Sequence, residues 1–355
     1  MKTTGFKKIL ALCVSASFCG ACAKVNFSPV PEEIASTSKT VNVSEVVAYG
    51  NKQVDFLLVF DDSNSMLPDL QKLAAGLGNF VSSLESSDID WQMCMTTTRS
   101  ISVGGSDTWG TSYNWTGYSP SGGTPAHILK RGTSNLDSIF VNTVNTLTIG
   151  GAGSGDERGI KAAYQHFKST SSNNCYRPGA ALSVIIVSNE DERSVGGDAS
   201  KVKSNDAVGT YQPLEDEDMP AKLVAVTKTM FGNDIRFTFN SIIVKPGDAT
   251  CEATQDAAGT SPSHQGIIYD QMSNLTEGGV GSICDSNFAS SLNTFKDKIV
   301  NSMTDLTLQC VADPGTMKVE INGKAYKNFE VKKNILKFHS PLIEGTKLDL
   351  SFDCK

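Results

Sequence analysis

The feature that most constrains this chain is an abrupt change of pattern after an apolar run. Residues 54–60, VDFLLVF, form a near-continuous hydrophobic segment of strand length, typical of a central strand covered on both faces. The polar stretch DDSNS follows at residues 61–65, and apolar residues at helical spacing come next: Met66, Leu70, Leu73, Leu77, Val81 and Leu84. The pattern predicts an α/β fold with polar side chains at the carboxyl end of a strand, where open α/β sheets bind ligands.

The polar stretch carries one carboxylate and two hydroxyls at every second residue. Asp61, Ser63 and Ser65 therefore project to one side of the turn and can share a hard cation, which prefers oxygen ligands. The alternative is helix capping, because Ser, Asp and Asn are preferred N-cap residues. The two roles are compatible, and the strand before the motif and the helix after it favour a metal site.

The segment VDFLLVFDDSNSM, residues 54–66, resembles the first strand and the metal-ion-dependent adhesion site (MIDAS) of the von Willebrand factor type A (VWA) domain. In that family the site also takes a Thr or Ser from a second loop and an Asp from a third loop. The resemblance implies a doubly wound, mostly parallel central sheet flanked by helices. It also implies a divalent cation, Mg²⁺ first, with Ca²⁺ or Mn²⁺ as alternatives.

The second loop is expected at residues 150–156, GGAGSGD, before a helix with an apolar face. Glycine lets the backbone approach an ion closely, and Ser154 takes the position of the family's Thr. The alternative is an ordinary glycine-rich helix entry in which Ser154 or Asp156 is the cap.

The third loop departs from the family pattern. Residues 180–187, AALSVIIV, predict another buried strand, and SNEDE follows at 188–192. Asn189 occupies the position of the family's Asp, and an amide adds no charge, so ion affinity should fall. Either Glu190 or Asp191 compensates, or the site is weak; a solvated acidic loop is the alternative.

The VWA-like domain is expected to span residues 51–308, with alternating strands and helices and two insertions. The first insertion, residues 99–125, carries four aromatic side chains that could form a recognition loop or pack onto the domain itself. These are Trp109, Tyr113, Trp115 and Tyr118. The second insertion, residues 193–218, ends in the acidic run EDED, which could bind calcium or precede a solvated helix.

Beyond the domain, residues 309–355 change to a period of two and contain the turn Asn322-Gly323. The pattern predicts a small all-β appendix. Because so short a segment buries little apolar surface, it should need a disulfide and contact with the main domain.

The amino terminus predicts export. Lysines precede a short apolar stretch, and the sequence CGAC at residues 19–22 resembles a bacterial lipobox, with Cys22 as the lipid acceptor. Residues 1–21 would then be a lipoprotein-type signal peptide and residues 22–50 a flexible tether to a membrane, the outer membrane if the host has one. The alternative is a conventional cleavage site at Ala21 or Ala23.

Six cysteines remain after the signal and the lipid acceptor, an even number that favours three disulfides in an exported chain. Fifteen pairings are available. Sequence order suggests Cys251 with Cys284 and Cys310 with Cys354, which leaves Cys94 with Cys175.

Composition argues against some classes of function. A formal net charge of −7 argues against nucleic acid as a partner, and four histidines without metal-binding helical spacing argue against a zinc hydrolase. The preferred function is adhesion or protein interaction through a bound cation that captures a carboxylate of a protein partner. The alternatives are a structural envelope lipoprotein with a vestigial metal site and a metal-assisted hydrolase. A hydrolase also needs a general base, for which only Glu190 and Asp191 are near, so an enzyme is not expected.

Overall fold

The computed structural model describes residues 40–46, 52–103, 106–120, 126–147, 154–169, 174–207, 209–232, 235–258, 261–302, 306–332, 334–339, 342 and 345–355. The predicted signal peptide, the lipid acceptor Cys22 and the first part of the predicted tether lie outside the described residues. So do residues 150–153 of the predicted second loop.

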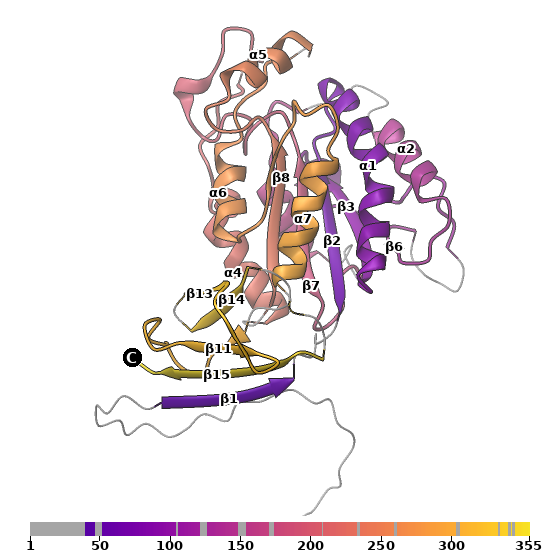
Figure 1. The fold of residues 1–355 in the computed structure, drawn as a ribbon. Helices are drawn as coiled ribbons and strands as arrows, with labels where there is room; N and C mark the ends of the chain where they lie inside the picture. Colours follow the sequence, from indigo (N-terminus) through magenta and orange to yellow (C-terminus); the bar gives the residue numbers. More distant parts are fainter. Residues whose placement is uncertain are drawn as a thin grey trace, which may run out of the picture. The chain divides into compact units, whose positions relative to one another are not determined.

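A six-stranded, mostly parallel sheet forms the centre of the main domain, as predicted (Figure 1). Its order is β6-β3-β2-β7-β8-β9, and only β6 runs antiparallel to its neighbour. The strands are β2 (Gln53–Phe60), β3 (Asp90–Thr97), β6 (Leu129–Lys130), β7 (Ala181–Val187), β8 (Phe237–Ile243) and β9 (Val280–Ser282). The apolar run that predicted a central strand is therefore β2, between β3 and β7.

Two separate hydrophobic clusters explain why β2 is apolar on both faces. Phe56 and Phe60 pack with residues of α1, α2 and α7, whereas Leu57 and Val59 pack with residues of α3, α4 and α6. The alternating side chains of a strand point to opposite faces, so a strand covered on both sides has no polar face. The helices are α1 (Leu67–Ser86), α2 (Leu136–Leu147), α3 (Gly159–Lys168), α4 (Pro220–Phe231), α5 (Ala249–Ala258), α6 (Ile267–Leu275) and α7 (Ala289–Ser302).

The aromatic residues of the first insertion pack onto the domain itself. Trp115 is buried and lies edge to face with Phe140, their ring centroids 5.7 Å apart. Tyr113 and Tyr118 pack against the same cluster. The insertion also contains a short hairpin of β4 (Ile101–Val103) and β5 (Ser106–Thr108). Of the two interpretations of these rings, the structure favours packing over a recognition loop.

The carboxyl-terminal segment forms two small antiparallel sheets, ordered β1-β15-β11-β12 and β10-β14-β13. The strands are β10 (Leu306–Thr307), β11 (Lys318–Ile321), β12 (Lys324–Tyr326), β13 (Phe329–Lys332), β14 (Ile335–Phe338) and β15 (Lys347–Asp353). The predicted all-β appendix is therefore present.

One strand of the appendix comes from the part of the chain predicted to be a tether. Residues 40–46 form β1 (Thr40–Val46), which pairs along its whole length with β15. The physical reason is a short alternation: Val41 and Val43 pack against the apolar cluster of the appendix, while Asn42 is exposed. The prediction of a flexible tether up to residue 50 was wrong for this segment.

All three predicted disulfides are formed: Cys94–Cys175, Cys251–Cys284 and Cys310–Cys354. Such bridges indicate an oxidising compartment, as expected for an extracellular location. Among the helices of the described residues, none has both the length and the apolar character needed to cross a membrane.

Candidate metal site

The first loop of the candidate site leaves β2 at its carboxyl end and turns at once. Asp61 is fully buried and is held from both sides: the backbone N–H of Ser63 donates to its Oδ1 at 3.0 Å, and the Ser188 hydroxyl donates to its Oδ2 at 2.8 Å. The hydroxyl oxygens of Ser63 and Ser65 lie 3.0 Å apart. The sequence motif thus places a buried carboxylate next to two adjacent hydroxyls; Ser63 and Ser65 line the cleft described below, whereas Asp61 does not.

Helix capping does not account for these hydroxyls. A 3₁₀ turn (Asn64–Met66) precedes α1, and neither Ser63 before the turn nor Met66 before the helix makes a side-chain cap hydrogen bond. Pro68 in the first turn of α1 removes one amide that would need a partner. Ser63 and Ser65 therefore contact each other at the mouth of a cleft instead of capping the helix.

The cleft has a volume of about 280 Å³, and residues of all three predicted loops line it. Ser63 and Ser65 come from the first loop, Ser154 from the second and Glu190 from the third. Residues of the second insertion and of the segment before α6 also line it: Asp206, Ala207, Thr210, Ser261 and Pro262. The first and third loops meet because β2 and β7 are parallel neighbours, so their carboxyl ends lie at the same edge of the sheet.

In the second loop, Ser154 also stabilises its own turn. Its hydroxyl accepts a hydrogen bond from the backbone N–H of Asp156 at 3.0 Å, and its backbone N–H donates to Glu157 Oε1 at 3.0 Å. Arg158, the residue before α3, makes no side-chain cap. Ser154 therefore stabilises its own turn and lines the cleft, and it does not cap α3.

The third loop differs from the predicted arrangement. Asn189 is buried and does not line the cleft; its backbone carbonyl accepts from the N–H of His264 at 2.8 Å, and its Oδ1 has no hydrogen-bond partner among the described residues. Glu190, one residue later, lines the cleft. The residue that reaches the site is thus a carboxylate, although Asn189 stands where the family carries Asp.

The next two acidic residues are used as helix caps. Asp191 accepts from the backbone N–H groups of Ile267 and Ile268 at 3.0 and 2.9 Å, at the start of α6. Glu192 accepts from the N–H groups of Ile160 and Lys161 at 2.7 and 3.0 Å, at the start of α3. Anionic side chains at helix N-termini satisfy unpaired amides and favour the helix dipole. Asp191 is thus committed to α6 and is not among the residues that line the cleft.

A buried carboxyl group that the sequence pattern did not single out lies at the same site. Glu157 is fully buried; it accepts from the Thr98 hydroxyl and from the backbone N–H of Ser154. Burial raises its pKa well above the ordinary value, and the charges of Asp61 and Glu190 raise it further. Its place directly before α3 resembles an ordinary first-turn glutamate, so sequence alone offered no signal.

Burial and neighbouring carboxyl groups raise the pKa values of the acidic side chains at this site. Burial, followed by the charges of Asp61 and Asp206, raises the pKa of Glu190 to about 8. Burial also raises the pKa of Asp61, although hydrogen bonds from Ser63 and Ser188 oppose that rise. A bound cation would reverse this balance by favouring the ionised forms. The donor set of carboxylates and hydroxyls fits a hard divalent ion such as Mg²⁺ or Ca²⁺.

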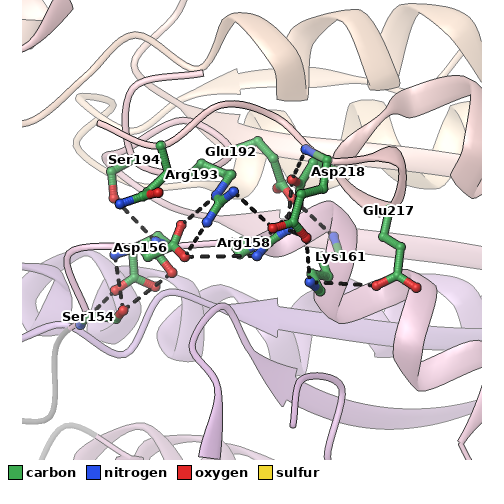
Figure 2. A network of polar contacts seen from close by, with 12 residues as sticks. Ser154, Asp156, Arg158, Lys161, Glu192, Arg193, Ser194, Glu217 and Asp218 are labelled. Carbon is green, nitrogen blue, oxygen red and sulfur yellow. Dashed lines mark hydrogen bonds and ion pairs between the residues drawn. The ribbon is translucent and has the colours of Figure 1, made fainter. Parts of the chain in front are cut away.

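A network of ion pairs around the buried Arg158 and Asp218 holds the second loop against the second insertion (Figure 2). Arg193 donates twice to Asp156, at 2.9 Å each, and Arg158 donates twice to Asp218, at 2.8 Å each. Glu215 joins the network through Arg158 at 2.7 Å. Of the acidic run in the turn before α4, Glu215 and Asp218 pair with arginines, whereas the exposed Asp216 pairs with Lys222. The predicted solvated helix N-terminus is therefore wrong for the buried Asp218.

A second group of ligand-type side chains lies far along the chain from these loops. Cys94, His127 and Cys175 have side-chain atoms within 4.8 Å of one another. Because the two sulfur atoms form a disulfide, they do not supply thiolate ligands.

Comparison of the sequence with protein-family models gives no match, and comparison with curated proteins gives none either. Solved structures with a weak overall likeness include three proteins. Human COPII-coat protein Sec24c has 9% identity and a TM-score of 0.38 over 89% of this chain and 42% of that one. The pilus adhesin SpaC from Lactobacillus rhamnosus GG has 10% identity and a TM-score of 0.34 over 90% and 41%.

Proximal thread matrix protein 1 from the mussel byssus has 12% identity and a TM-score of 0.35 over 76% of this chain and 52% of that chain. The chain spans about half or less of the length of each of these proteins. The VWA assignment therefore stays a resemblance carried by the motif and by the fold.

Proposed function

We propose that this protein is an exported binding module that captures a carboxylate of a protein partner through a divalent cation, Mg²⁺ in the first place. Asp61, Ser63, Ser65 and Ser154 would hold the ion, and Glu190 would supply the third-loop carboxylate in place of Asn189. The cation would supply a positive centre that attracts an anionic ligand. The observation that carries this proposal is the convergence of three loops on one cleft beside the carboxyl groups of Glu157 and Glu190, whose pKa values are raised by burial and then by the charge of Asp61.

The chain's own residues would contribute in distinct ways. Asp61 is held in one orientation by Ser63 and Ser188, so it would meet an ion without reorganisation. Ser63 and Ser65 would be neutral ligands of the ion, so the ion would keep positive charge that attracts the carboxylate of the partner. Glu157, behind Ser154, would stabilise the loaded state through its charge.

The amino-terminal residues favour a location of this module at a membrane. We infer lipidation at Cys22 and attachment to a membrane of the cell envelope, because the lipobox-like CGAC follows a signal-type segment. Replacement of Cys22 by Ala should move the protein from the membrane fraction to the soluble fraction and abolish incorporation of labelled palmitate. Unchanged membrane association would contradict the inference.

A structural lipoprotein with a vestigial metal site is the second candidate. Asn189 in the position of the family's Asp favours it, because that change removes one charge from the expected ligand set. Metal-assisted hydrolysis is less favoured: Glu190 is assigned here to the ion, and a reaction would need a further general base.

The direct test is metal binding by the chelator-treated protein. Mg²⁺, Ca²⁺ and Mn²⁺ are titrated by calorimetry, and thermal unfolding is followed with and without each ion. We expect the parent to bind and to be stabilised, Asp61→Asn to lose both effects, and Asp216→Asn to behave as the parent. Asp216 is a matched control because its side chain is 82% exposed and does not line the cleft. Absence of any metal-dependent shift in the parent would refute the proposal and favour the vestigial site.

A further inference from the structure

A second cavity lies at the edge of the central sheet where β8 begins, opposite the edge that carries the candidate metal site. Its volume is about 670 Å³, within the range of cavities that hold small ligands. The carboxyl-terminal parts of α4, α6 and α7 line it from the main domain, and β13 and β14 line it from the appendix. The proposed function makes no use of this cavity.

Basic side chains outnumber acidic ones in this cavity, although the whole chain has a formal net charge of −7. The basic ones are Lys228, Arg236, Lys298 and Lys337, and the acidic ones are Glu277 and Glu330. Both acidic side chains are already paired. Glu277 forms an ion pair with Lys337. Glu330 forms one with Lys332 at 3.2 Å. The positive charge that is left favours an anionic ligand.

Two of the basic side chains can reach such a ligand without giving up a partner. Within the part of the chain that the structure describes, the ammonium groups of Lys228 and Lys298 make no hydrogen bond or ion pair, and both residues are exposed. Together with the guanidinium of Arg236 they suit a phosphate group, which accepts several charge-assisted hydrogen bonds. The alternative for Lys228 is the helix dipole alone, because it lies in the last turn of α4, where a cation is favoured without any ligand.

Exposed apolar side chains stand beside these cations. Leu275 is 53% exposed and Ile335 is 36% exposed, and both line the cavity. Apolar side chains in water next to positive charge are typical of surfaces that touch a membrane, where apolar contact adds to the attraction of anionic headgroups. A free phosphate ion would use the cations and leave both apolar side chains in water. The lining therefore favours an anionic lipid over a free anion.

The path of the chain keeps the appendix near the proposed membrane anchor. Residues 23–39 separate the inferred lipid acceptor Cys22 from β1, and β1 pairs along its whole length with β15 of the appendix. Even if fully extended, this segment spans at most about 60 Å. A protein anchored through Cys22 would thus hold β1 within that distance of the membrane surface.

We propose that this cavity binds the phosphate headgroup of an anionic membrane phospholipid. Lys228, Arg236 and Lys298 contact the phosphate. Leu275 and Ile335 contact the part of the lipid next to the headgroup. The inference does not depend on the metal site and shares with the proposed function only the location at a membrane. Because salt screens exposed charges, the cavity alone would not retain the Cys22→Ala protein in a membrane fraction at physiological ionic strength.

The test is sedimentation of the Cys22→Ala protein with lipid vesicles at low ionic strength. We expect binding to vesicles of phosphatidylglycerol and none to vesicles of phosphatidylcholine, which carry no net charge. Lys228→Gln and Lys298→Gln should each weaken binding about fivefold, the contribution of one basic residue near an anionic surface. Lys318→Gln is the matched control and should bind as its parent does, because Lys318 is exposed on β11 and does not line the cavity.

A second arm separates a lipid from a free anion. Soluble glycerol phosphate, which has the headgroup chemistry without acyl chains, is titrated by calorimetry into the same proteins. Leu275→Asn should weaken binding to phosphatidylglycerol vesicles and leave any heat from glycerol phosphate unchanged. Since Lys228, Lys298 and Leu275 are all exposed, none of these substitutions removes a buried contact.

The outcomes are distinct. Equal binding to both kinds of vesicle, or a loss in Lys318→Gln as large as in the cavity variants, overturns the inference. Binding of glycerol phosphate without binding to vesicles also overturns it, because the site would then take a free anion. Calorimetric titration of Mg²⁺ into the same Cys22→Ala protein tests the proposed function separately: absence of metal binding with intact vesicle binding refutes that function and leaves this inference standing.

Discussion

Replacement of Glu190 by Gln should have opposite effects on the metal-free and the metal-loaded protein. Without metal, burial and the charges of Asp61 and Asp206 raise the pKa of Glu190 to about 8, from the ordinary 4.5. The folded protein therefore keeps a proton on Glu190 at pH values where the unfolded chain has lost it. The free energy of unfolding should fall as the pH rises from about 4.5 to about 8, because the unfolded state binds fewer protons in that window.

The size of the effect follows from the pKa difference. At about 1.4 kcal/mol per pH unit, the penalty is of the order of 3 kcal/mol at pH 7 and vanishes near pH 4. Glutamine has the same shape and no proton to lose, so Glu190→Gln should raise the free energy of unfolding of the metal-free protein by up to about that amount at pH 7. With saturating Mg²⁺ the variant should instead have a lower free energy of unfolding than the parent, because the variant lacks one of the charges that stabilise the ion.

Urea unfolding at pH 5 and pH 7.5, in chelator and in Mg²⁺, measures both effects. Glu320→Gln, an exposed glutamate on β11, is the control and should change neither. The reasoning fails if Glu190→Gln is destabilising in chelator at pH 7.5, or if its effect is the same at both pH values. It also fails if Mg²⁺ stabilises the variant as much as the parent.

Three further predictions test other parts of the structure. Because Glu190 must lose its proton to hold an ion, the Mg²⁺ association constant of the parent should rise with pH between 6 and 8 in calorimetric titrations, and a flat profile would contradict this. Arg158→Ala leaves the buried carboxylate of Asp218 unpaired, so chemical unfolding should show a loss of about 3–5 kcal/mol; a loss below 1 kcal/mol would count against the network. Removal of the disulfide Cys310–Cys354 by double substitution with Ala should cost about 2–4 kcal/mol in the appendix, measured by hydrogen exchange of its strands, and unaltered protection would show that the bridge is dispensable.

The sequence predicted most of the fold because its main elements have strong local patterns. The run at 54–60 is apolar at every position but one. That pattern is typical of a strand covered on both faces, and the run became β2. The helical stripe that begins at Met66 became α1. Residues 40–46 were missed because the alternation is carried by few apolar residues, and their strand exists only through pairing with β15, more than 300 residues away.

The candidate site was predicted in part. The sequence placed Ser63, Ser65 and Ser154 in loops that follow parallel strands or precede helices, and the structure brings all three to one cleft. Alignment with the family pattern pointed to Asn189, yet Glu190 lines that cleft. Which of two successive residues faces a site depends on the local path of the backbone, here fixed by the bond from His264 to the Asn189 carbonyl.

The sequence by itself determined the fold class and the place of the first polar loop, because both follow from local periodicity and residue spacing, and the order of its cysteines suggested the pairing that the structure has. Only the tertiary structure decided which acidic residues lie at the cleft and which cap helices. Asp191 and Glu192 follow Glu190 directly, yet they cap α6 and α3, while Glu157 from another loop is buried behind Ser154. The physical reason is that a carboxylate's role depends on the amides, cations and solvent around it, and packing of distant segments brings those groups together.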